Sequence, residues 1–224
     1  MNRAWSLLRL ASPQLPIGAY SYSQGLESAI EQGIVHDTQS AKVWISDQLV
    51  LNISYFEAPL LFRILTAIAN HKWEELTQWE AEYKASRETA ELYGESQQLG
   101  FSLTQLMKQL PELNKELDQK ILNVKDPSFF FAWSVAAYAW SLSPEDGLAA
   151  WLWSWLENQL IVLMKTLPLG QQASQNLLSQ LLPVLDQAYH QAMTYTDDEL
   201  ANGTWGLAIA SMNHEIQYSR LFRS

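Results

Sequence analysis

The sequence predicts a single all-α domain of about ten helices. Apolar residues recur near a period of 3.6 along most of the 224 residues, and no stretch shows the two-residue alternation of a strand. Proline and glycine recur often enough to favour many short helices over a bundle of fewer, longer ones. Because no repeat or shift in composition divides the chain, we expect residues 1–224 to form one domain. Within it, residues 1–23 form a first helix and a loop, and residues 213–224 form a C-terminal tail.

Helix signals follow one another along the whole chain. Proline or glycine ends most segments, and Asp, Ser or Thr stands where a helix should begin. Pro183 is expected to kink its helix or to split it in two. In chain order, the expected helices are 2–11, 24–33, a third opened by Asp37 or Thr38, a fourth with Pro59 as its first residue, 72–83, 86–110, a short helix within 112–126, 129–142, 144–167, 171–189, and a last one after the capping-box spacing at 196–199.

The segment after Ser143 carries the clearest helix pattern. A hydroxyl cap, a proline in the first turn and two acids facing the helix dipole open it. Leucines and tryptophans then repeat at helical spacing up to Leu167, and Pro168 and Gly170 end the pattern. Trp153 lies off this apolar stripe, so it belongs to a second packing face or to an interface.

Composition excludes several classes of protein. Apolar residues make up 48%, which excludes a disordered chain. The net charge of −10 disfavours binding to nucleic acid or to an anionic membrane, because both require cationic groups. The absence of cysteine excludes disulfides and thiolate sites. No apolar run reaches the ~20 residues of a membrane span, and Arg9 interrupts a signal-like start, so we expect a cytoplasmic protein.

Residues 11–31 form the most unusual stretch, with two prolines and Gly18 followed by alternating tyrosines and serines. Such a stretch is too unfavourable for a helix to serve only as a connector. From chemistry alone, a tight loop packed by two tyrosines and a functional loop are about equally good interpretations.

A search for chemistry finds no active site. The chain has no phosphate-binding glycine loop and no G-x-S-x-G elbow. None of its four histidines forms a metal-binding pair, and surface or capping roles are the simpler interpretation. The six arginines include none whose flanks single it out as an arginine finger. We therefore predict no catalytic, cofactor-binding or metal-ligating residue, and an interaction protein rather than an enzyme.

Four stretches, with Glu57 between the first two, carry a common pattern along the chain. They comprise Leu8, Ala11, Ser12, Pro13, Leu15, Pro16, Gly18, Tyr20, Ser21, Ser23, Gly25, Leu26 and Glu27; Arg87–Leu92, Glu95, Ser96 and Gly100; Asn158, Lys165, Leu167–Gln171 and Gln175; and His214, Glu215, Gln217 and Ser219–Ser224. In this order, they resemble the urease accessory protein F (UreF) family over nearly the whole chain. Tyr93, Ser174 and Ile216 stand where the family has arginine, glycine and threonine.

The resemblance implies an all-helical homodimer that acts in nickel insertion into urease. Such proteins bridge urease accessory protein D (H in some bacteria) and the GTPase accessory protein G, and the complex docks on apo-urease. Nickel is then only a transient cargo, and the protein gates or modulates GTP hydrolysis. Two alternatives stay open: a helical hydrolase that uses Ser21 or Ser23, and a helical protein-binding module unrelated to urease.

The resemblance also implies partner-binding residues. Lys165 and the turn that follows are expected on the side that faces the GTPase, although Lys165 also suits the dipole at a helix end. The tail is expected to become ordered when accessory protein D binds, with Arg220 pairing to an acid and Phe222 filling a pocket; the alternative is that it folds back on its own core. The implied residues are Pro16, Gly18, Tyr20, Ser21, Ser23, Glu27, Lys165, Pro168, Gly170, Gln171, His214, Glu215, Arg220, Leu221 and Phe222.

Overall fold

The computed structural model describes residues 2–110, 124–167 and 169–224, and it is all-helical, with no strand in these ranges. The short helix expected within 112–126 lies almost wholly outside them. The predicted fold class is confirmed. The helices are α1 (Arg3–Leu10), α2 (Leu26–Glu31), α3 (Thr38–Gln48), the π-helical segment η2 (Leu49–Glu57), α4 (Ala58–Ala69), α5 (Trp73–Ala85), α6 (Ala90–Gln109), α9 (Phe129–Ala139), α10 (Pro144–Thr166), α11 (Gln171–Thr194) and α12 (Trp205–Glu215), with 3-10 turns at Ala19–Ser21 and Asp197–Glu199.

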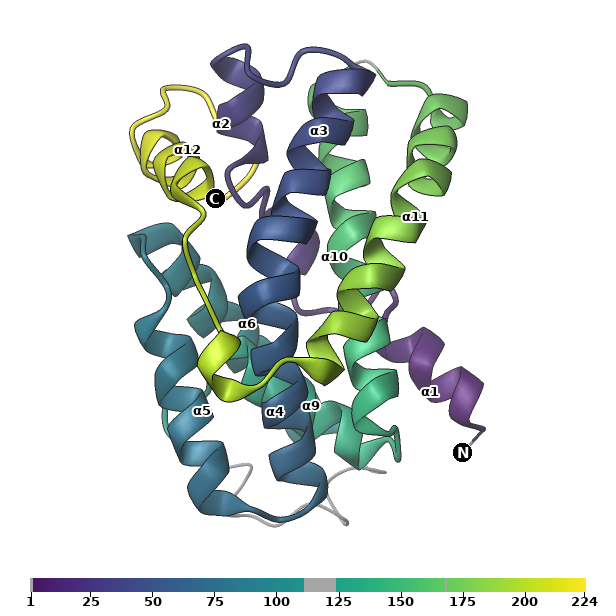
Figure 1. The fold of residues 1–224 in the computed structure, drawn as a ribbon, viewed down its shortest axis with the longest axis vertical. Coiled ribbons are helices and arrows are strands. Elements are labelled where there is room, and N and C mark those ends of the chain that lie inside the picture. The colour runs from purple at the N-terminus through teal and green to yellow at the C-terminus, as the bar shows by residue number, and fades with distance from the viewer. Residues whose placement is uncertain (1, 111–123, 168) are drawn as a thin grey trace.

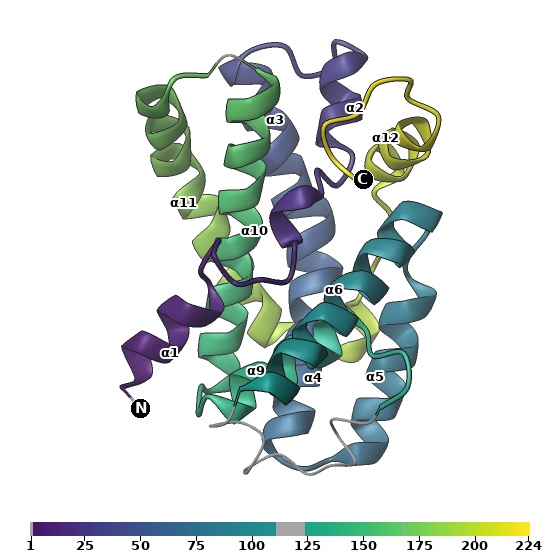
Figure 2. The same ribbon diagram turned by 180° about the vertical axis from the view of Figure 1, so that it is seen from behind.

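Helix α9 lies at the centre of the lower half of the molecule, with α4, α5, α6 and α10 packed around it (Figures 1 and 2). Its sequence is apolar on every side, which is typical of a helix enclosed by neighbours. Nine of its eleven residues are buried. Tyr83 of α5 stacks on Phe130 with ring centroids 4.0 Å apart, so aromatic packing joins α5 to the core.

One helix runs without interruption from Thr38 to Ala69, through α3, η2 and α4 (Figure 1). Asp37 caps it, as predicted. The prediction that Pro59 begins a separate helix is wrong. Proline cannot donate to the carbonyl four residues earlier, so the turns before it widen into a π-helix. The freed carbonyl of Tyr55 accepts a hydrogen bond from the backbone N–H of Ala201 (3.3 Å), which ties down the connection between α11 and α12.

This continuous helix is long and apolar enough to span a membrane by length and composition alone. However, 67% of its most apolar window is buried inside the protein, against α9, α10 and α11. Its apolar character is therefore explained by its place in the core.

Two helices differ from their expected form. Pro183 lies inside α11, which continues through it as one helix rather than splitting. Helix α1 packs on α10 and extends away from the body at the end of the molecule opposite α12 (Figure 2). Trp5 and Leu8 share one side of this helix by their spacing, yet both are exposed, whereas Ser6 and Leu10 are buried.

Gly100 permits a close contact between α6 and the start of α9. A Cβ atom at this position of α6 would lie 2.1 Å from the carbonyl oxygen of Pro127, just before α9. Only glycine fits at that distance. The crossing of α6 and α9 thus depends on one residue without a side chain, and it places the polar residues of α6 beside the loop that follows α1.

Candidate functional site

The loop of residues 11–25 enters the molecule between α10 and α6, and its shape depends on left-handed backbone conformations. Gly18, Gln24 and Gly25 have φ angles of 83°, 53° and 78°. Gly25 also faces α12, where an added Cβ would lie 3.2 Å from the Cβ of Ala210. Glycine is therefore favoured at position 25 for two reasons: it adopts the left-handed backbone conformation, and it leaves room for α12.

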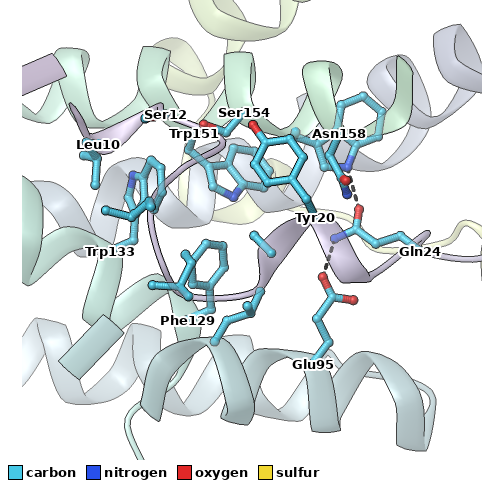
Figure 3. A pocket seen from close by; sticks show the side chains of 15 residues that line it. Leu10, Ser12, Tyr20, Gln24, Glu95, Phe129, Trp133, Trp151, Ser154 and Asn158 are labelled. Atoms are coloured by element: carbon cyan, nitrogen blue, oxygen red, sulfur yellow. Dashed lines mark hydrogen bonds between the residues drawn. The ribbon is translucent and has the colours of Figure 1, made fainter. Parts of the chain in front are cut away.

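Gln24 links the loop to two helices in the interior (Figure 3). Its side-chain oxygen accepts a hydrogen bond from the indole N–H of Trp155 (2.7 Å), and its amide donates to a Glu95 carboxylate oxygen (2.8 Å). Nearby, the Asn158 amide donates to the carbonyl of Tyr22 (2.8 Å), and the Tyr20 hydroxyl donates to Glu157 (2.7 Å). Side chains of α6 and α10 thus fix the loop from both sides.

Glu95 occupies an unusual position for a carboxylate. It is 7% exposed, and it lies near a buried ion pair in which Arg87 donates to Glu57 (2.8 Å). Burial raises the pKa of Glu95 to about 7, against the lowering effect of its hydrogen bonds from Gln24 and Ser224. This carboxyl group therefore changes its charge near neutral pH.

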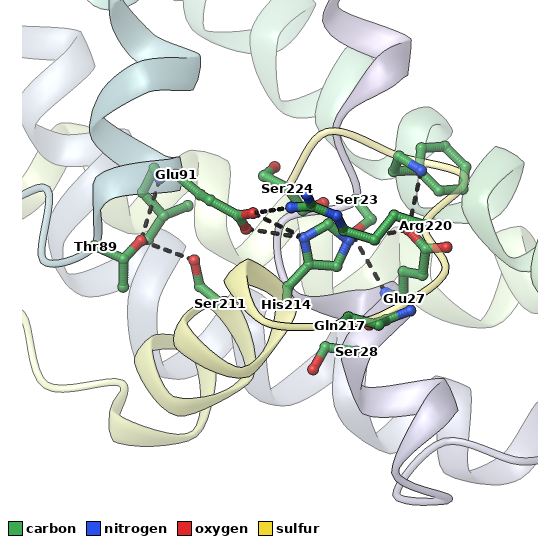
Figure 4. A network of polar contacts seen from close by, with 12 residues as sticks. Ser23, Glu27, Ser28, Thr89, Glu91, Ser211, His214, Gln217, Arg220 and Ser224 are labelled. Atoms are coloured by element: carbon green, nitrogen blue, oxygen red, sulfur yellow. Dashed lines mark hydrogen bonds and ion pairs between the residues drawn. The ribbon is translucent and has the colours of Figure 1, made fainter.

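The C-terminal tail is folded onto this loop, with Glu27 of α2 at the point of contact (Figure 4). The Glu27 carboxylate accepts hydrogen bonds from the backbone N–H groups of Leu221 (2.7 Å) and Phe222 (3.0 Å). Its second oxygen also lies 3.0 Å from Nε2 of His214. A buried carboxylate that holds three donors joins α2, α12 and the tail.

His214 is completely buried, so its interpretation as a surface or capping histidine is wrong. Its Nδ1 lies 2.9 Å from a Glu91 oxygen on α6, opposite the contact of Nε2 with Glu27. Arg220 of the tail also contacts Glu91, at 3.2 Å. Two carboxylates and two basic groups from α2, α6, α12 and the tail therefore form one network (Figure 4).

The last residues complete the closure. The backbone N–H of Ser23 donates to the carbonyl of Ser224 (2.7 Å), to which the Ser23 hydroxyl also donates. The Ser224 hydroxyl donates to Glu95 (3.1 Å). Phe222 is 5% exposed, and the ammonium group of Lys165 lies 5.2 Å from the centre of its ring.

These contacts correct the expectation for the tail. In the chain by itself the tail is ordered, Phe222 fills a pocket of its own protein, and the acid that Arg220 pairs with is Glu91. The alternative, in which the tail folds back on the core, is the arrangement found. Helix α12 also extends to Glu215, three residues into the range expected to be tail.

The structure brings most of the implied partner-binding residues together, although several are internal. Ser23, Glu27, His214 and Phe222 are buried, so they position the surface rather than form it. Tyr20 and Ser21 are partly buried beside them. Pro168 lies outside the described residues. Pro16, Gly18, Lys165, Gly170, Gln171, Glu215, Arg220 and Leu221 are exposed.

Sequence reasoning missed three residues of the interior: Gln24, Trp155 and Glu157. Trp155 was assigned to core packing, which is correct for its ring but leaves out its indole N–H. Gln24 stands among the serines of the loop, directly before Gly25, and a polar residue before a glycine in a packed loop was the available signal.

The geometry bears on the hydrolase alternative. Both ring nitrogens of His214 contact carboxylates, and the Ser23 hydroxyl contacts the Ser224 carbonyl and the Glu27 N–H. In the described part of the chain, no hydrogen bond joins a serine hydroxyl to a histidine ring; the one contact between these residue types is from the backbone N–H of His36 to the Ser40 hydroxyl (3.0 Å). Within the same residues, no group of three or more His, Asp or Glu side chains could hold a metal ion. The contacts of the site bind its own segments together.

Comparison with known proteins identifies the class. The UreF family model matches residues 35–182. The chain is 61% identical to the urease accessory protein UreF of Nitrosococcus oceani, 58% identical to that of Pseudomonas fluorescens and 56% identical to that of Azotobacter vinelandii, in each case over 224 residues and 100% of both chains. The chain belongs to the UreF family of urease accessory proteins, as the four stretches indicated.

Proposed function

We propose that this protein is a non-catalytic component of the complex that inserts nickel into apo-urease. In this proposal it forms a homodimer in the cytoplasm and bridges urease accessory protein D (H) and the GTPase accessory protein G. It gates or modulates GTP hydrolysis while nickel passes as a transient cargo, and it holds no cofactor of its own. The names of its relatives support the accessory role.

The observation that carries this proposal is an exposed apolar face on α12, beside the closed tail. Trp205, Ile209, Met212 and Ile216 follow one another at intervals of four, three and four residues, so they lie along one side of the helix. Trp205 is 77% exposed and Ile216 is 84% exposed. Large apolar residues in such a row are typical of a surface that a protein partner covers. We assign this face, with Leu221 of the tail, to accessory protein D.

A second surface suits the GTPase. Lys165 is exposed at the end of α10, and Gly170 and Gln171 are exposed where α11 begins. Because the Lys165 ammonium group also lies over the Phe222 ring, this surface is in contact with the tail. The arrangement supports a route by which binding at the tail changes the surface offered to the GTPase.

The arginines favour a scaffold over a donor of an arginine finger. At least four of the six bind carboxylates within the described residues, at N–O distances of 2.7–3.2 Å. These pairs are Arg3–Asp146, Arg63–Asp197, Arg87–Glu57 and Arg220–Glu91. A guanidinium group held in this way would have to leave its partner before it could reach a phosphate.

A third apolar surface fits a second copy of the chain. Trp153 is 39% exposed, and it lies with Leu182 and Pro183 along a groove of about 690 Å³ between α10 and α11. This groove is on a different pair of helices from the α12 face. The homodimer and the contact with accessory protein D can therefore form at the same time.

The test is co-purification with accessory proteins D and G, using two matched substitutions. Trp205→Asp should abolish capture of accessory protein D and leave the sedimentation coefficient unchanged. Trp153→Asp should weaken self-association and leave capture of accessory protein D in place. If Trp205→Asp captures accessory protein D as well as the unchanged chain does, the assignment of the α12 face is wrong. If the unchanged chain binds neither protein, the proposed function is wrong.

Lys165 is tested separately. Lys165→Ala should reduce both binding of accessory protein G and activation of urease, whereas Lys165→Arg, which keeps the charge over the Phe222 ring, should retain most of both. Intact binding and activation with Lys165→Ala would leave Lys165 with only its role at the helix end.

A further inference from the structure

Two small cavities lie next to each other beneath the loop of residues 11–25. The first has a volume of about 40 Å³ and is bounded by the loop, α6, α9 and α10; the second has a volume of about 20 Å³ and reaches Arg87. Gln24, Glu95, Phe129 and Trp151 line both. Two polar and two aromatic side chains therefore form the shared wall (Figure 3).

Each cavity is lined by a residue that carries a buried polar atom without a hydrogen-bond partner among the described residues. Asn158 lines the first cavity, and its Oδ1 is buried without a protein partner, although its amide nitrogen is bonded to the Tyr22 carbonyl. Arg87 lines the second, and its Nε is also buried without a protein partner, although its Nη1 binds Glu57. The first atom is an acceptor and the second is a donor.

Leaving either atom unpaired in the interior would destabilise the fold, because the atom would lose its hydrogen bonds to water without gaining others. Buried polar atoms in folded proteins are nearly always paired, with water where the protein offers no partner. A buried water needs roughly 10–15 Å³ of such volume. On that scale the first cavity has room for about three waters and the second for about one.

We propose that these two cavities form a binding site for a small cluster of ordered water molecules. One water donates to Asn158 Oδ1, and one accepts from the Arg87 N–H. The polar edges of Gln24 and Glu95 supply the further partners that a buried water requires. The site accounts for Arg87 and Asn158, two polar residues of the family stretches. Each carries one hydrogen-bonding atom that no contact among the described residues satisfies.

The experiment uses the full-length protein and measures water directly. In NMR spectra that detect transfer from long-lived water, the Arg87 Nε proton should give a cross-peak with water. The backbone N–H of Ile64, which is fully buried in α4, is the matched control and should give none. In crystals at atomic resolution, water oxygens should lie about 2.7–3.2 Å from Arg87 Nε and Asn158 Oδ1.

Xenon provides the opposing test, because an apolar, dry cavity takes up xenon whereas a polar, hydrated one does not. Crystals pressurised with xenon should show no xenon in either cavity. In the variant Asn158→Leu, the water at position 158 should be lost while the water at Arg87 is retained, since the two lie in different cavities. Xenon in either cavity of the unchanged protein, or no water signal and no water density at both atoms, would overturn the proposal.

Discussion

Replacing Glu95 with glutamine should make the stability of this protein less dependent on pH. Burial raises the pKa of Glu95 from its ordinary value of 4.5 to about 7. Because the pKa in the folded state is higher than in the unfolded state, the stability that the protonated carboxyl allows is fully present below pH 4.5 and is lost as the pH rises through about 7. Glutamine stays neutral throughout, so the variant should not suffer this loss.

The size of the effect follows from the shift. About 1.4 kcal/mol per pKa unit gives a loss of about 3 kcal/mol between pH 4.5 and pH 8 in the unchanged protein. Glutamine also loses one hydrogen bond, because Gln24 and Ser224 both donate to Glu95. That loss, about 1 kcal/mol, is the same at every pH. The variant should therefore be less stable than the unchanged protein at pH 4.5 and more stable at pH 8.

Urea denaturation followed by tryptophan fluorescence, at half-unit steps from pH 4.5 to 8, measures the difference in unfolding free energy between the two proteins. Taking the difference removes the titration of groups that both share. Glu215→Gln serves as the control, because Glu215 is exposed and its difference should stay flat. A flat difference for Glu95→Gln as well would refute the reasoning about its burial.

Three further predictions concern stability. Glu27→Ala removes the partner that the backbone N–H groups of Leu221 and Phe222 share with the His214 ring, so the unfolding free energy should fall by about 3 kcal/mol or more in urea denaturation. Deleting residues 215–224 removes a buried part of the core, at a cost of about 3 kcal/mol in unfolding free energy. At about 2–4 °C per kcal/mol, the melting temperature should fall by about 6–12 °C. An unchanged melting temperature would mean that the tail is not held as described. Gly100→Ala should destabilise the protein because its Cβ would lie 2.1 Å from the Pro127 carbonyl oxygen, whereas Gly94→Ala in the same helix, where an added Cβ meets open space, should stabilise it by up to about 1 kcal/mol in the same melting measurement.

Features fixed by neighbouring residues could be predicted from the sequence. Asp37 caps α3 and Ser143 caps α10, each in a capping box, because the side chain and the backbone it bonds are three residues apart. A helix over 129–142 was also predicted from local pattern, and α9 occupies Phe129–Ala139. In each case the interaction lies within one helix or follows from its composition.

Features that depend on distant residues could not be predicted in this way. The role of Pro59 was assigned from local preference, but Ala201 supplies the compensating hydrogen bond to Tyr55 that accommodates a proline within a helix. His214 is 187 residues from Glu27, and no periodicity reports such a pair. Family resemblance did single out both residues, yet it did not indicate that they contact each other inside the protein.

The contact between the tail and Glu27 also has a consequence for biosynthesis. The two hydrogen bonds join residues 194 and 195 positions apart, nearly the whole length of the chain. Contacts between such distant residues form late in folding, because the intervening chain must be ordered before they are gained. On the ribosome, Leu221 and Phe222 emerge long after Glu27, so the nascent chain cannot close this network until both of these residues have been synthesised. A partner that recognises the closed tail would therefore bind only chains in which both segments are present.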